Sequence, residues 1–199
     1  MDSHDNLPDA IITSKGEISK KFLELGIKSF KQACHYVHEM TYGYNSTYDD
    51  DMILFEENKG TCTTKHAIIA GLARELDIPL HKKVGVYRFT ETITTGAEEI
   101  LNKYNIPYIP MVHCFLIYNQ YRFDLTEGNI NGKKTSIKDF IETREVEPFL
   151  SRKDEYMWYK EVLKEKVLPS AEMKGITERT LLKAREEIIL LLKNSIKRQ

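Results

Sequence analysis

Hydrophobic residues in the first half of the chain recur at helical spacing. One set falls at positions i, i+3, i+4 and i+7 and predicts a helix with a single buried face: Phe30, Ala33, Cys34 and Val37. The stretch 65–76, KHAIIAGLAREL, also reads as a helix, and its first half is apolar on nearly every side. A helix of that kind is enclosed by the rest of the fold. Cys62 then lies at its start.

Strand-like patterns occupy the middle of the chain. Residues 84–86 alternate with their neighbours, and residues 97–104 read as a short helix. Residues 111–118 and 121–126 are rich in β-branched and aromatic side chains and are separated only by residues 119–120. Two such runs around a two-residue connection predict a β-hairpin.

The last third of the chain reads as helical. Capping residues predict helices at 136–144, 151–166 and 177–196. Residues 151–199 therefore form a C-terminal helical extension. At the other end, residues 1–16 are polar and contain proline and glycine, which predicts a loosely attached arm.

Length and element order indicate one α+β domain. The 199 residues are the size of one ordinary domain, and no repeat or long linker divides them, so residues 1–199 are expected to form a single domain. Helices come first, strands follow, and helices end the chain. That order favours an α+β fold over a doubly wound sheet.

Composition and charge limit the classes of partner that the chain is expected to bind. The formal net charge of -1 lacks the basic excess of a nucleic-acid binder, and no segment is long and apolar enough to span a membrane, so neither partner is expected. No signal peptide or lipidation motif is visible, which predicts a cytoplasmic location. In that reducing compartment the three cysteines, Cys34, Cys62 and Cys114, are expected as thiols.

Cys62 has the setting of a nucleophile. A cysteine at a helix N-terminus faces unpaired backbone N–H groups and the positive end of the helix dipole, which favour thiolate over thiol. Gly60 permits a close backbone approach, and the neighbouring threonine hydroxyls can cap free amides. The alternative is a small buried core residue, because cysteines are among the most buried residue types.

The hairpin places a histidine and an aspartate in phase. With residues 119–120 as the turn, Phe115 faces Asp124 and His113 faces Thr126, so all four side chains project from one face. His113 and Asp124 become diagonal neighbours, about 7–8 Å apart across the strands. A three-residue turn would destroy this phasing. The carboxylate can orient the imidazole, which can then deprotonate a thiol. Each residue alone also fits a structural role.

These residues resemble the transglutaminase-like superfamily of papain-fold enzymes. The stretches GTCTTKH and VHCFLIYNQYRFDLT are similar to its Gly-x-Cys helix start, its strand histidine and its Asp-x-Thr ending, across about residues 30 to 130. The resemblance is to small stand-alone microbial members. It implies a buried nucleophile helix packed on a small antiparallel sheet, with Cys62 as nucleophile, His113 as base and Asp124 as its orienting residue. It also implies hydrolysis or acyl transfer through a thioester.

The substrate is then expected to be a peptide, an amide or an ester. The chain has no room for the additional β-domains and calcium sites of eukaryotic transglutaminases, and it lacks the zinc-binding Cys-x-x-Cys pairs of peptide N-glycanases. It also lacks the Arg-Gly-Gly stretch of arylamine N-acetyltransferases, which argues against acetyl-CoA. No cofactor is expected, and the oligomeric state stays open.

An oxyanion hole needs two donors. The backbone N–H of Cys62 is the natural first one. For the second, the candidates are Asn45, in the loop 42–51, and Gln32, with Asn45 preferred because a loop upstream of the nucleophile can fold over it. A turn role for Asn45 is the alternative.

Two other interpretations remain open. Cys62 and His66 lie four apart on a helix face and could bind a metal with His113 or Cys114, but consecutive strand residues point to opposite faces, so no metal is expected. His66 is then a helix-surface residue or one that supports the site from behind. The second interpretation is a non-catalytic binding module that keeps the fold and uses its C-terminal helix as a partner surface.

Overall fold

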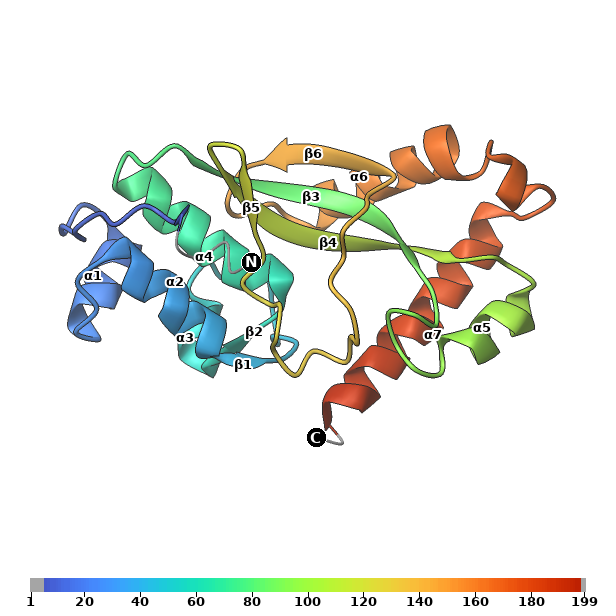
Figure 1. Cartoon of the computed structure of the whole chain (residues 1–199), viewed down its shortest axis with the longest axis horizontal. Coiled ribbons are helices and arrows are strands. Elements are labelled where there is room, and N and C mark those ends of the chain that lie inside the picture. The colour runs from blue at the N-terminus through green and yellow to red at the C-terminus, as the bar shows by residue number, and fades with distance from the viewer. Residues whose placement is uncertain (1–5, 198–199) are drawn as a thin grey trace. The chain divides into compact units, whose positions relative to one another are not determined.

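The structure is a computed structural model that describes residues 6–197. Its helices are α1 (Glu17–Glu24), α2 (Phe30–Glu39), α3 (Ile53–Glu57), α4 (Cys62–Glu75), α5 (Ala97–Tyr104), α6 (Arg152–Val162) and α7 (Glu178–Lys197) (Figure 1). A π-helix (Leu163–Val167) and a 3-10 helix (Ala171–Met173) follow α6. The strands are β1 (Thr41–Tyr42), β2 (Lys59–Gly60), β3 (Leu80–Phe89), β4 (Ile109–Tyr118), β5 (Tyr121–Phe123) and β6 (Glu142–Val146). The chain divides into two compact units.

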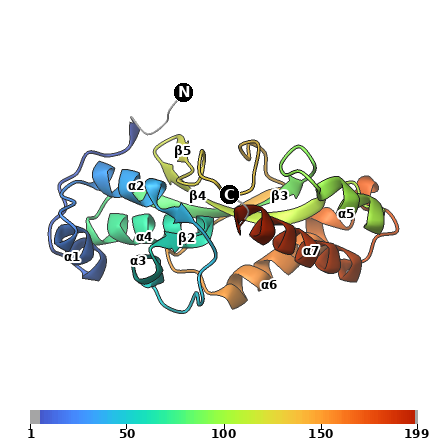
Figure 2. The same cartoon turned by 90° about the horizontal axis from the view of Figure 1, so that it is seen from below.

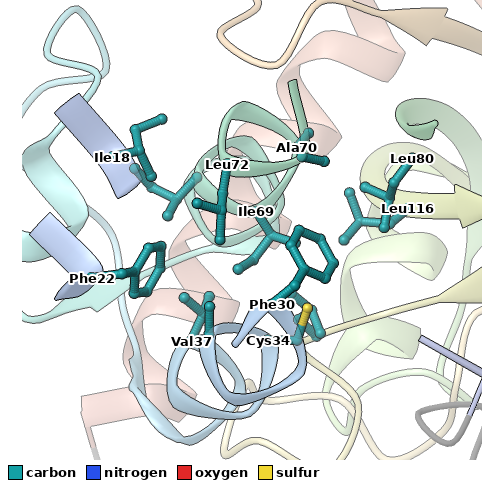
Figure 3. Close-up of a cluster of buried hydrophobic side chains, with 14 of the residues drawn as sticks. Ile18, Phe22, Phe30, Cys34, Val37, Ile69, Ala70, Leu72, Leu80 and Leu116 are labelled. Atoms are coloured by element: carbon teal, nitrogen blue, oxygen red, sulfur yellow. The ribbon is translucent and has the colours of Figure 1, made fainter. Parts of the chain in front are cut away.

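The first unit is built around α4. Within the described chain it comprises residues 6–84, 114–129 and 145–151. Helix α2 lies alongside α4 in both views (Figure 1; Figure 2). Figure 3 shows the core that they share with α1 and the sheet, which includes Ile18, Phe22, Phe30, Cys34, Val37, Ile69, Ala70, Leu72, Leu80 and Leu116.

Burial of α4 on nearly every side confirms its expected enclosure. Cys62 and every residue of the stretch 64–73 are buried. Close packing also explains a glycine inside the helix, because a Cβ on Gly71 would lie 2.5 Å from Ile18 Cδ1 and 2.9 Å from Phe149 Cε2. The helix begins at Cys62, as expected.

The N-terminal arm is fixed in its described part, residues 6–16, and the residues before it lie outside the description. Leu7 and Ile12 are buried members of the core. The backbone N–H of Ile12 donates to the carbonyl of Lys28 at 2.8 Å. The expectation of a loosely attached arm is therefore wrong for these residues, because buried apolar side chains interrupt its polar sequence.

The second unit contains the C-terminal helices. Within the described chain it comprises residues 85–113, 130–144 and 152–197. Helix α5 packs against α7 (Figure 1; Figure 2). The start of α7 confirms the capping prediction, because the Thr177 hydroxyl accepts a hydrogen bond from the Thr180 N–H at 3.2 Å.

Helix α6 joins the same unit. Its Tyr159 is fully buried, and the phenol donates to the Pro110 carbonyl at 3.0 Å. The guanidinium of Arg185 lies 4.7 Å from the centre of that tyrosine ring. The only tryptophan of the chain, Trp158, is also buried in α6.

A four-stranded sheet has the order β5-β4-β3-β6. The predicted two-residue turn is confirmed, since Tyr118 pairs with Tyr121 in the antiparallel register, and Asn119 takes a positive φ of 54°. The expected extent of the second strand is wrong. Strand β5 ends at Phe123, so Asp124 lies just beyond the ladder rather than within a strand that continues to Thr126.

The helix predicted at 136–144 is absent from the described chain. The Ile141 N–H donates to the Val86 carbonyl at 2.7 Å, and β6 follows next to β3 in the sheet. Gly85 leaves room for Phe140, because a Cβ on Gly85 would lie 2.3 Å from Cδ1 of the Phe140 ring. Pairing with a strand far away in sequence has overridden a local capping signal.

The architecture is mixed α+β, with a small antiparallel sheet and C-terminal helices. This part of the fold prediction is confirmed. Among the helices of residues 6–197, none is long and apolar enough to cross a lipid bilayer.

Candidate active site

The N-terminus of α4 presents Cys62 at the end of a tightly packed turn. The Thr64 hydroxyl accepts the Thr61 N–H at 3.1 Å, which satisfies the backbone just before the helix. A Cβ on Gly60 would lie 2.5 Å from that hydroxyl and 2.9 Å from Leu54 Cδ1, so a larger residue would displace the turn. Cys62 itself is 8% exposed. The cysteine therefore has the helix-start position expected of a nucleophile.

Asn45 supports this turn from the preceding loop. Its side-chain N–H groups donate to Glu57 Oε2 and to the Lys59 carbonyl, both at 3.0 Å. Its carbonyl accepts the Thr64 hydroxyl at 3.0 Å. Because a side-chain amide has two N–H donors, both are used. The expectation of Asn45 as second oxyanion donor is therefore wrong in this structure, and the residue is a structural brace.

Two other side chains bear on the second donor. Gln32 uses its side-chain oxygen to accept the N–H groups of Lys28 and Ser29, which caps α2. Thr61 Oγ1 is buried and has no hydrogen-bond partner among the described residues. A hydroxyl of this kind, next to Cys62, can donate to an incoming oxygen.

Asp124 is held by a local turn directly after β5. Its Oδ1 accepts both the backbone N–H and the hydroxyl of Thr126, at 2.9 and 2.7 Å. The Asp124 side chain is 8% exposed, and Thr126 is buried. Within the Asp-x-Thr sequence, the threonine therefore fixes the direction of the aspartate carboxylate with its backbone N–H and its hydroxyl.

His66 joins Cys62 to the Asp124 segment. Its Nδ1 donates to the Cys62 carbonyl at 2.7 Å, and its Nε2 accepts the Leu125 N–H at 2.8 Å. These two bonds assign the neutral tautomer with the proton on Nδ1. Asp124 Oδ1 lies 3.5 Å from the same Nε2, whose lone pair is directed at Leu125. The turn that carries Cys62 and the turn that carries Asp124 thus share one buried imidazole.

The expectation of a helix-surface position for His66 is wrong, because its side chain is fully buried. The alternative expectation, that His66 supports the site from behind, agrees with its bond to the Cys62 carbonyl, but its partner Leu125 was not predicted because Leu125 is distant in sequence. A usable signal was present, however. A histidine four residues after Cys62, inside an otherwise apolar helix, needs polar partners for both ring nitrogens.

Lys65 forms a second buried link. Its ammonium donates to the carbonyls of His38 and Met40 at 3.0 and 2.5 Å, and to Asn129 Oδ1 at 2.6 Å. Burial lowers the pKa of Lys65 to about 8, while the charges of Glu39 and Asp124 oppose that shift. The lysine ties the end of α2 to α4 and to the segment that follows Asp124. Sequence reasoning missed it, because lysine is rarely fully buried.

His113 is the last residue of the second unit's first segment, 85–113, and lies in strand β4. It is buried, and its ring makes an edge contact with Tyr87, with centroids 6.2 Å apart. The Lys133 ammonium lies 3.4 Å from His113 Nδ1. Since an ammonium only donates, Nδ1 accepts, and the proton of the neutral ring is on Nε2. Cys62 and Asp124 belong to the first unit, so the three-residue arrangement itself stays a prediction.

The other two cysteines have structural surroundings. Cys34 lies on the buried face of α2 and is 1% exposed, and burial strongly raises the pKa of its thiol. Cys114 is fully buried, with its sulfur 3.9 Å from the Thr63 hydroxyl. Within residues 6–197, no cluster of three or more histidine, cysteine, aspartate or glutamate side chains is arranged to hold a metal ion.

No protein-family model matches this chain, and no curated protein or solved structure matches it either. What the chain does must follow from its own residues.

Proposed function

We propose that this chain is a cysteine-dependent acyl hydrolase or acyltransferase with a papain-like, transglutaminase-like core. One observation carries the proposal. Cys62 is the first residue of a buried helix, and His66 links its turn to the Asp124 turn by hydrogen bonds of 2.7 and 2.8 Å. A buried polar network of this kind fixes two side chains to which the sequence gives complementary chemical roles.

The proposed reaction begins with proton transfer from the Cys62 thiol to His113. The thiolate attacks the carbonyl carbon of an amide, peptide or ester, and the developing oxyanion is stabilised by the Cys62 N–H. His113 then returns the proton to the leaving amine or alcohol, which departs and leaves a thioester on Cys62. Water or an amine attacks the thioester, and the thiol is regenerated with the acid or the new amide.

The histidine tautomer supports these roles. With its proton on Nε2, His113 can donate that hydrogen to a carboxylate, which is the role proposed for Asp124. Nδ1 is then the nitrogen that receives the thiol proton. The anchored Oδ1 of Asp124 limits rotation of the carboxylate, which a fixed imidazole orientation requires. For the second oxyanion donor, the Thr61 hydroxyl replaces Asn45.

The test is capture of the thioester. The purified protein is incubated with panels of peptides, amides and activated esters, and its intact mass is measured after rapid acid quenching. An acyl adduct that peptide mapping places on Cys62 is expected. It should be lost in Cys62→Ala and kept in Cys34→Ala. An adduct that persists in Cys62→Ala, or no adduct with any acyl donor, would overturn the proposal.

A further inference from the structure

A lysine ammonium borders the nitrogen that the proposed mechanism uses as its base. The Lys133 ammonium lies 3.4 Å from His113 Nδ1, and both residues belong to the second unit. A neutral imidazole nitrogen has one lone pair. While Lys133 donates to Nδ1, that lone pair is engaged and the nitrogen is a poorer acceptor for a thiol proton.

The loop that carries Lys133 is held on both sides of this residue. The Lys134 N–H donates to the Ile93 carbonyl at 2.7 Å, and the Thr94 hydroxyl donates to the Gly132 carbonyl at 2.8 Å. The Lys133 N–H itself donates to the side-chain oxygen of the buried Asn131 at 2.9 Å. The backbone at this lysine is therefore fixed, and from this backbone position its ammonium reaches the ring.

The neighbouring lysine has a different environment. Lys134 is exposed, and its ammonium lies 3.4 Å from the Glu91 carboxylate. Two aromatic rings lie near His113 and Lys133: Tyr87 contacts the imidazole edge-on, and Phe140 contacts Tyr87 with centroids 6.4 Å apart. His113 is itself buried, and a low-dielectric environment strengthens the attraction between a cation and an anion.

We infer that Lys133 selects acyl substrates that carry a negative charge beside the reacting carbonyl. The inference rests on the proposed function of Cys62 and His113. The anionic group of the substrate draws the ammonium away from Nδ1, which releases the lone pair to accept the thiol proton. A substrate of this class, with a carboxylate next to the scissile bond, thus contributes to its own activation, whereas a neutral analogue leaves the base engaged.

Two alkylating reagents of nearly equal size test the charge preference. Iodoacetate and iodoacetamide both convert the Cys62 thiolate to a thioether and release iodide, but only iodoacetate is anionic. Rates at Cys62 are followed by peptide mapping, and each rate is divided by the rate of the same reagent with N-acetylcysteine. The normalised preference for iodoacetate in the wild-type protein is expected to exceed one and to fall with added salt.

The variants separate the possible roles of the lysine. In Lys133→Met the iodoacetate preference should fall by about threefold or more, whereas the iodoacetamide rate stays equal or rises. Lys133→Arg should keep much of the preference, and the matched control Lys134→Met should keep all of it. A parallel slowing of both reagents would assign Lys133 to thiolate stabilisation instead and overturn the inference.

Failure of the two proposals can be told apart. If Cys62 does not react before Cys34 and Cys114, or if His113→Ala leaves its rate unchanged, the proposed function fails. If Cys62 reacts first in a His113-dependent manner but shows no preference for iodoacetate, only the inference about Lys133 fails. Even if Lys133→Met does not fold, the absence of an iodoacetate preference in the wild-type protein would overturn the inference, and Lys133→Arg should still keep much of that preference.

Discussion

The surroundings of Cys62 and Asp124 differ in kind from those of His113. The first two residues sit in turns that are joined by buried hydrogen bonds through His66, and Lys65 ties the same helix to its neighbours. His113 contacts the ring of Tyr87 and lies beside the ammonium of Lys133. Changes in the first region should therefore alter stability and chemistry together, whereas changes at His113 should alter chemistry with a small effect on stability.

The largest effect is expected for His113→Ala on chemistry. Loss of the proposed base should slow acyl-adduct formation on Cys62 by about a thousandfold or more, while the free energy of unfolding falls by only about 1 kcal/mol. Single-turnover mass spectrometry and urea unfolding measure the two quantities. Asp124→Asn should slow the reaction less. If His113→Ala lowered the free energy of unfolding as much as a change in the first region does, the two regions would not differ in the way proposed.

His66→Ala should have the largest effect on stability. It leaves the Cys62 carbonyl and the Leu125 N–H without their partner, which should lower the free energy of unfolding by about 2–4 kcal/mol. Urea denaturation followed by circular dichroism measures the change. The matched control is His81→Ala, because that half-exposed histidine pairs with Glu145 at the surface and its loss should cost less than about 0.5 kcal/mol. Equal costs at both positions would contradict the linking role of His66.

Lys65→Met should cost about 1–2 kcal/mol at pH 7, because carbonyls at the end of α2 lose a donor. Burial lowers the pKa of Lys65 to about 8 in the folded protein, against an ordinary value of about 10.4. Between these values the unfolded chain binds more protons at this site, so the wild-type protein gains stability relative to Lys65→Met as pH rises from about 8 to 10. The gain is at most about 3 kcal/mol.

Paired urea titrations of the wild-type protein and Lys65→Met at pH 7, 8, 9 and 10 measure this difference. Because both proteins share all other titrating groups, the difference isolates the lysine. A difference that is flat, or that shrinks with pH, would show that the folded protein keeps Lys65 protonated as readily as water does.

The smallest effect is expected for Asn45→Ala. Loss of its bonds to Glu57, Lys59 and Thr64 should cost about 1 kcal/mol of stability. Its rate of acyl-adduct formation should change by less than about threefold, because loss of a true oxyanion donor costs about a hundredfold or more. A hundredfold loss would return Asn45 to the oxyanion hole.

Local sequence patterns predicted the elements whose geometry depends on neighbours in the chain. The start of α4 at Cys62, the bounds of α5 and the pairing of Tyr118 with Tyr121 all follow from periodicity or turn length. The premature end of β5 shows where this reasoning stops. The Thr126 N–H donates to the Asp124 side chain, whereas in a longer strand the backbone groups here would pair with β4.

Features that depend on distant partners could not be predicted in the same way. The segment 136–144, which reads as a helix, leads instead into β6, which lies beside β3 in the sheet. The Asn45 side chain is hydrogen-bonded to Glu57 and Thr64. The burial of His66 and Lys65 likewise depends on Leu125 and Asn129, which the hairpin brings to α4. The candidate residues could be named from sequence, but the bonds that hold them could not.

The position of Trp158 allows the unfolding of one unit to be followed by intrinsic tryptophan fluorescence. The only tryptophan is buried in α6, within the second unit, whereas His66 and Lys65 lie in the first. Emission from this indole therefore observes one unit while circular dichroism observes the helices of both. If a substitution in the first unit shifts the emission midpoint as far as the dichroism midpoint, residues 6–197 unfold as one cooperative body. If the emission midpoint stays where it is, each unit has a stability of its own.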